Sequence, residues 1–123
     1  MRVLLDECLP RKLKSELRGH GVQTAQEQGW SGLKNGALLQ MASGSGIDVF
    51  LTVDRSIEFQ QNLTDLNIAV VAMVAPSNRL RDLRPIMARV REALNRVRPG
   101  TVTSVGDLVV GELPTVYRFV SAA

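Results

Sequence analysis

The chain has one cysteine, no long apolar run and no segment of low complexity. Because Cys8 has no partner for an internal disulfide, the sequence fits a reducing compartment. No apolar run approaches the roughly 20 residues that a membrane-spanning helix needs, and no apolar signal segment follows Met1. We therefore expect a cytoplasmic protein that makes no contact with a membrane.

The sequence has the composition of a globular domain. Its 123 residues are 45% hydrophobic and 22% charged, a balance typical of water-soluble folds. A chain of this length buries roughly two-thirds of its unfolded surface. We expect one domain over residues 1–106. Residues 107–123 are expected to form a C-terminal extension that adds a strand or docks on a partner.

Positive charge is concentrated in two groups. The net charge of the chain is +3, yet residues 79–98 carry seven arginines against two acids. Clustered arginine suits phosphate oxygens, which predicts contact with nucleic acid. The second group consists of Arg11, Lys12, Lys14 and Arg18. The alternative interpretation is that both groups are solvated helix faces.

Apolar patterns predict alternating strands and helices. Residues 2–6, 22–25, 49–53 and 68–74 are typical of strands, the last two of strands buried on both faces. Apolar residues at helical spacing predict one helix that begins at Leu9 and one long helix from Leu80 to Val97. A further helix is predicted after Asn35, which is expected to be its N-cap. Residues 56–62 predict a short helix or turn, and residues 101–105 an edge strand. The order predicts a three-layer α/β/α domain with a mainly parallel sheet.

Two aspartates, Asp6 and Asp54, follow strands at their carboxyl ends. If these strands are neighbours in a parallel sheet, both carboxylates lie where open α/β sheets bind ligands. Close carboxylates repel each other unless a cation lies between them, and Mg²⁺ or Mn²⁺ suits oxygen ligands. Such an ion can activate water for attack on a phosphodiester. The alternative is that each aspartate caps the helix that follows it.

Four segments in order resemble the signatures of small PIN-like domains: residues 5–10 (LDECLP), 29–36 (GWSGLKNG), 51–55 (LTVDR) and 77–80 (SNRL). More narrowly, residues 1–106 are similar to the predicted nuclease toxins of bacterial toxin–antitoxin pairs. This resemblance implies a PIN-type α/β/α fold and Mg²⁺-dependent cleavage of single-stranded RNA. It also implies a cognate antitoxin as partner and, by analogy, a homodimer. The family's metal-binding acids correspond to Asp6 and Asp54.

The chain departs from the family at Ala37, where related sequences commonly carry an acid. Losing a carboxylate lowers the affinity for a divalent ion, which favours a competing function: a PIN-like module that binds RNA or a partner without cleaving. A receiver-type signalling domain is a more distant alternative, because no lysine follows Lys34. Further candidates for the catalytic group are Glu7, Glu27, Asn35 and Glu58. The expected nucleic-acid contacts are Arg11, Lys12, Lys34, Arg55, Arg79 and Arg81.

Three other residues each allow two interpretations. Trp30 either stacks a base or anchors its loop on the core. Asn78 either faces the ligand site or forms a turn. Cys8, near the start of an expected helix, either has a lowered pKa or is a small packing residue.

Overall fold

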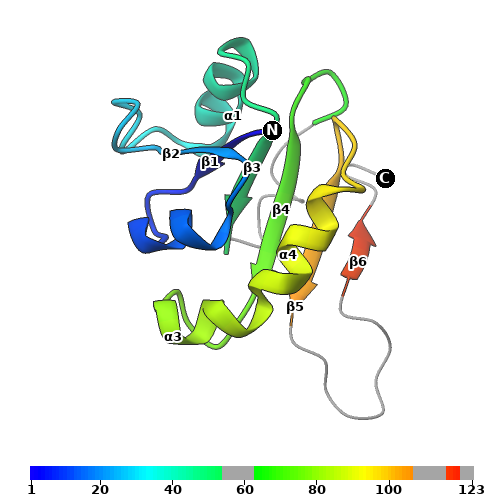
Figure 1. Ribbon diagram of the computed structural model, residues 1–123. Coiled ribbons are helices and arrows are strands. Elements are labelled where there is room, and N and C mark those ends of the chain that lie inside the picture. Colours follow the sequence, from blue (N-terminus) through cyan, green and yellow to red (C-terminus); the bar gives the residue numbers. More distant parts are fainter. Residues whose placement is uncertain (54–62, 107–115, 120–123) are drawn as a thin grey trace.

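In a computed structural model, residues 1–53 and 63–106 are described in full and residues 116–119 by their backbone. Six strands form one sheet in the order β2-β1-β3-β4-β5-β6 (Figure 1). The first five strands are parallel, and β6 runs antiparallel to β5. Their bounds are β1 Arg2–Leu5, β2 Gly21–Thr24, β3 Val49–Thr52, β4 Ala69–Val74, β5 Val102–Gly106 and β6 Val116–Phe119.

The predicted strands are present, and the two that precede Asp6 and Asp54 are neighbours. Leu5 of β1 is opposite Leu51 of β3 in a parallel register. Every residue of β3 is buried, as the continuous apolar run predicts for a central parallel strand. The carboxyl ends of β1 and β3 therefore lie side by side.

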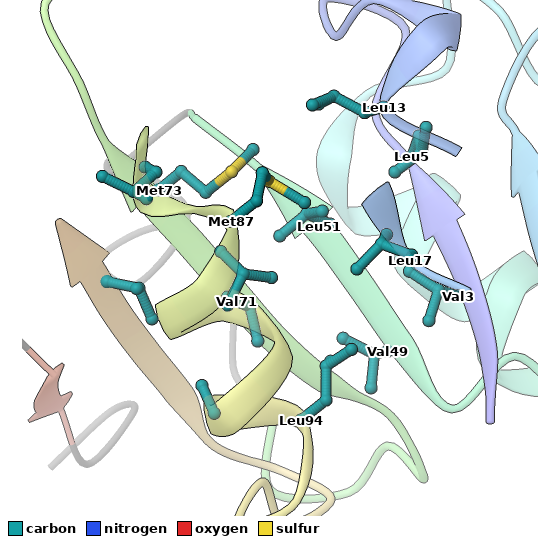
Figure 2. Packing of buried hydrophobic residues seen from close by; sticks show 14 of the residues in the cluster. Val3, Leu5, Leu13, Leu17, Val49, Leu51, Val71, Met73, Met87 and Leu94 are labelled. Carbon is teal, nitrogen blue, oxygen red and sulfur yellow. The ribbon is translucent and has the colours of Figure 1, made fainter. Parts of the chain in front are cut away.

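One face of the sheet is covered by the 3-10 helices η1 (Arg11–Glu16) and η2 (Arg84–Ile86) and the α-helices α3 (Leu80–Leu83) and α4 (Met87–Leu94). Figure 2 shows leucine and methionine side chains of these helices against the strands. Each fully buried leucine contributes about 1.5–3 kcal/mol relative to an exposed one. The labelled side chains of this layer are Leu13, Met87 and Leu94 of the helices and Leu17, which follows η1 directly.

The other face of the sheet is covered by α1 (Asn35–Gly44). Leu38 and Leu39 of this helix pack with Phe50 and Val70 of the strands in a second core. Trp30 belongs to the same core and is 9% exposed, so it anchors its loop instead of presenting a ring to a base. Apolar layers on both faces confirm the α/β/α prediction.

The long arginine-bearing helix is broken, which corrects the prediction of one helix. Its segments α3, η2 and α4 meet around Pro85. Proline has no backbone N–H and its ring clashes with the preceding turn, so a regular helix cannot continue through it. The apolar spacing was nevertheless informative, because Leu83, Ile86, Met87, Val90 and Leu94 are all buried.

The strand at residues 102–106 is not an edge strand, contrary to the prediction. β5 is hydrogen-bonded to β4 on one side and to β6 on the other, and all five of its residues are buried. Its neighbour β6 lies within residues 107–123, the part of the chain expected to form the C-terminal extension.

Two helix starts also differ from the predictions. The helix expected from Leu9 is a six-residue 3-10 helix beginning at Arg11. At α1 the N-cap is Lys34, whose carbonyl oxygen accepts from the backbone N–H of Leu38 at 2.8 Å. Asn35, predicted as the cap, is therefore the first helical residue. The predicted short helix or turn at residues 56–62 lies outside the described residues.

Candidate functional site

The carboxyl ends of β1 and β3 form the topological switch point of the sheet. β2 lies beyond β1 on one side, whereas β4 and β5 lie beyond β3 on the other. Chains leaving the carboxyl ends of two such strands diverge, and open α/β sheets bind their ligands there. In Figure 1, α3 lies beyond the arrowhead of β4, at the same edge.

Asp6 follows β1 directly at this switch point. Its backbone N–H donates to the carbonyl oxygen of Leu51 at 3.0 Å, which extends the β1–β3 pairing by one residue. Its Oδ2 accepts a hydrogen bond of 2.6 Å from Oγ1 of Thr52, the last residue of β3. Thr52 is fully buried and Asp6 is partly buried. The Asp6 carboxylate is thus held across the end of β3.

Glu7 joins this edge to the loop before α1. Its Oε1 accepts from the backbone N–H of Gly32 at 3.0 Å, and its carbonyl oxygen accepts from Nε2 of Gln26 at 3.0 Å. Gly32 has a φ of 82°, a left-handed conformation that glycine adopts without strain. The hydrogen bond between Gly32 and Glu7 therefore joins residues 29–36 to residues 5–10, which include Asp6.

Cys8 joins the same edge to the turn after β4. Its carbonyl oxygen accepts from Nδ2 of Asn78 at 2.8 Å. The Asn78 side chain therefore reaches the segment that follows the carboxyl end of β1. Although Cys8 as a residue is exposed, desolvation of its thiol and, next, the nearby charge of Asp6 raise its pKa to about 11. The interpretation of Cys8 as a thiol of lowered pKa is therefore wrong.

Three consecutive residues thus bind three separate parts of the chain. Asp6 contacts Thr52, Glu7 contacts Gly32, and Cys8 contacts Asn78. We call these six residues the loop junction. Each contact joins the 5–10 segment to a different one of the other three segments that carry the family resemblance. Beside the junction, a recess of about 310 Å³ is lined by Leu9, Arg11, Thr24, Gln26 and Glu27.

The hydrogen bonds of Asp6 exclude its role as a helix cap. The N-cap of η1 is Pro10, and no side chain caps that helix. The Asp6 carboxylate instead accepts from Thr52, a residue of another strand. The alternative that Asp6 caps the first helix is therefore wrong.

The structure describes some of the other predicted site residues and not others. Asp54, Arg55 and Glu58 lie outside the described residues, so their predicted roles stay predictions. Within the described part of the chain, no group of three or more His, Cys, Asp or Glu side chains is arranged to hold a metal ion. Asp6 is a hard oxygen ligand of the kind that Mg²⁺ takes singly or in pairs together with water. Of the predicted pair of ligands, the structure describes Asp6 alone, and the magnesium site stays a prediction.

The remaining candidates occupy different places. Asn35 is partly buried at the first position of α1, and Ala37 is exposed two residues later. The Glu27 carboxylate is bound to Nζ of Lys14 at 2.6 Å and to the backbone N–H of Thr24 at 2.9 Å. Glu27 is therefore engaged at the end of β2 and does not join the loop junction.

Five of the six predicted phosphate-binding residues are described, and all five are exposed. Each lies within four residues of Cys8, Gly32 or Asn78 in the sequence, so these basic side chains belong to segments that meet at the loop junction. The five are Arg11, Lys12, Lys34, Arg79 and Arg81.

Sequence reasoning missed the part played by Thr52. The available signal was a hydroxyl residue ending an apolar strand, next to a strand that is followed by an acid. Only the parallel register of Leu5 with Leu51 brings Thr52 opposite Asp6, and this register is not evident from either segment alone.

Comparisons of the chain with protein-family models, with curated proteins and with solved structures find no match. Among the described residues, no helix has the length and apolarity needed to cross a membrane. The comparisons therefore identify no family, and the structure shows the fold class alone. The chain is an α/β domain with a five-stranded parallel sheet, in the order 2-1-3-4-5, and interspersed helices.

Proposed function

We propose that the protein is a metal-dependent endoribonuclease of PIN-like type that cleaves single-stranded RNA. The observation that carries this proposal is the loop junction. Four segments that resemble PIN-like signatures are far apart in sequence, and contacts of Asp6, Glu7 and Cys8 bring them to one edge. Their convergence at the switch point, where open α/β sheets bind ligands, is the arrangement that an active site needs.

Asp6 and Asp54 are the proposed ligands of Mg²⁺ or Mn²⁺. Such an ion supplies positive charge for the scissile phosphate and lowers the pKa of bound water. Thr52 positions the Asp6 carboxylate through its 2.6 Å hydrogen bond. Glu7 already accepts from Gly32 through one oxygen, so its other oxygen is the one available. Asn35 and Glu58 complete the set of proposed catalytic residues.

The exposed basic residues around the loop junction would hold the RNA backbone. Arginine and lysine neutralise phosphates without reading base sequence, which suits an enzyme that acts on single strands. The resemblance further suggests that the protein is a cytoplasmic toxin inhibited by a cognate antitoxin. It also suggests that the protein forms a homodimer.

A second candidate is a PIN-like module that binds RNA or a partner protein without cleaving it. Two observations favour it: Ala37 replaces the family's acid on the exposed first turn of α1, and the described residues gather no group of three metal ligands. Each missing carboxylate weakens the hold on a divalent ion.

The test is cleavage of single-stranded RNA by the purified protein with Mg²⁺ or Mn²⁺, beside Asp6→Asn and Asp54→Asn. We expect metal-dependent cleavage that both variants lose, because each removes a charged ligand but keeps the side-chain shape. Cleavage that survives in Asp6→Asn would contradict the proposed site.

Ala37→Glu separates the two candidates. An acid at this position suits the positive end of a helix, so the variant is expected to fold. If the scaffold lacks one ligand, Ala37→Glu gains cleavage. The matched control is Gln40→Glu, which adds the same charge at an exposed position one turn later in α1. Equal gains in both variants would indicate a general charge effect.

A further inference from the structure

The two basic groups of the sequence meet on the helical layer that contains η1 and α4. Nη1 of Arg91 donates to the carbonyl oxygen of Glu16 at 2.8 Å, across 75 residues of sequence. It also lies 3.5 Å from Oε1 of Glu16, and Nε of Arg84 lies 3.6 Å from Oε2. Glu16 therefore joins the end of η1 to the arginines of η2 and α4.

A recess of about 350 Å³ opens at this meeting point, lined by Ser15, Glu16, Arg18 and Arg91. Arg18 is exposed and has no hydrogen-bond or ion-pair partner within the described part of the chain. With Arg84 beside the recess, three arginines surround one glutamate. The recess therefore keeps a surplus of positive charge after its internal ion pairs are formed.

Arg91 is held in place before any ligand arrives. Its guanidinium is bound to a backbone carbonyl, which fixes the position of a side chain that would otherwise move freely. A guanidinium has five N–H donors, so the contact with Glu16 leaves others for a ligand. Arg91, which is fixed by this contact, and Arg18, which has no partner among the described residues, can both donate hydrogen bonds to the oxygens of a phosphate group.

We propose that this recess binds a phosphate of the RNA backbone at a second anchor, apart from the loop junction. This inference rests on the proposed function, because it says where the RNA bound at the loop junction makes a second contact with the protein. η1 begins beside the junction and the recess lies at its other end, so six residues at about 2 Å each separate the two sites by roughly 12 Å. At about 3.4 Å or more per nucleotide, a strand of roughly four nucleotides is long enough to reach both.

The experiment measures binding of single-stranded RNA of about 12 nucleotides without divalent ions, as a function of salt. Each lost phosphate contact reduces the slope of log K against log salt by about 0.7. We expect Arg18→Gln to reduce the slope by about 0.7, and Arg18→Gln with Arg91→Gln by about 1.4. Because Arg18 has no described partner, its single variant tests the recess without removing an internal contact.

The matched control is Arg96→Gln with Arg98→Gln, which removes the same charge from the segment that follows α4. Arg96 pairs with Glu92 four residues earlier, at 3.0 Å. We expect this control to bind RNA nearly as the unaltered protein does. A dinucleotide, too short to reach both sites, should lose much less affinity in the recess variants than the strand of about 12 nucleotides does.

Equal losses in the recess and control variants would overturn the proposal, since they would mean general attraction to positive charge. Unchanged RNA binding, with loss of binding to poly-glutamate, would assign the recess to an acidic protein segment and also overturn it. Failure of the unaltered protein to bind RNA at any salt would do the same. Because binding is measured without metal, these outcomes are independent of cleavage by the unaltered protein, which tests the proposed function.

Discussion

Thr52 Oγ1 donates a hydrogen bond of 2.6 Å to Oδ2 of Asp6, linking the last residue of β3 to the first residue after β1. The donor is fully buried and the acceptor partly buried. Hydrogen bonds to charged groups are stronger than those between neutral groups. This bond therefore both stabilises the switch point and fixes the direction of the carboxylate proposed to bind metal.

Thr52→Val should lower the free energy of unfolding by about 1–2 kcal/mol, because the carboxylate loses its charge-assisted donor. Urea unfolding measures this change. The control Thr103→Val removes a hydroxyl from β5, on the far side of β4 from β3, and should leave the Asp6 carboxylate undisturbed. An unfolding free energy that Thr52→Val leaves unchanged would mean that the hydrogen bond adds no stability.

Alkylation of the Cys8 thiol should follow a pH profile with its midpoint near 11, because desolvation and the Asp6 charge raise the thiol pKa. Cys8 is the single cysteine, so mass spectrometry reports this site alone. Asp6→Asn should move the midpoint to lower pH by removing the second of the two causes. A midpoint that Asp6→Asn leaves in place would contradict the proximity of the two side chains.

Glu27 should make stability depend on acidity. Its hydrogen bond with Lys14, and next that with the Thr24 backbone, hold its pKa below the ordinary value of 4.5. A carboxyl with a lowered folded-state pKa adds stability above pH 4.5 that is lost as the pH falls through the folded-state pKa. Thermal unfolding should therefore show a difference between the unaltered protein and Glu27→Gln at pH 7 that shrinks in acid. A difference independent of pH would refute this role.

The layers of the fold could be predicted from the sequence because local patterns determine them. The run before Asp54 is buried whatever its partners, and Leu38 and Leu39 face the sheet wherever their helix lies. Pro85 is also a local signal of a helix break, but the prediction of one helix rested on the apolar spacing alone. The status of β5 depends on β6, the next strand along the chain, and their pairing is not evident from either segment alone.

The candidate site could be predicted in part. The acid after β1 was evident, since a carboxylate at the end of a parallel strand has a recognisable pattern. The partners of Asp6, Glu7 and Cys8 were not evident, because Thr52, Gly32 and Asn78 reach them through strand register and loop shape. The meeting of Glu16 with Arg91 across the helical layer depends on packing in the same way.

The most direct test of the metal site uses Cys8 as a reporter beside Asp6. Mg²⁺ prefers oxygen ligands to thiols, so an ion held by Asp6 would offset the negative charge that raises the Cys8 pKa. At a fixed, mildly alkaline pH at which Mg²⁺ stays dissolved, we predict that Mg²⁺ speeds alkylation of Cys8 in the unaltered protein and leaves the rate in Asp6→Asn unchanged. A rate that Mg²⁺ leaves unchanged in the unaltered protein, or changes equally in both, would contradict a metal site at Asp6.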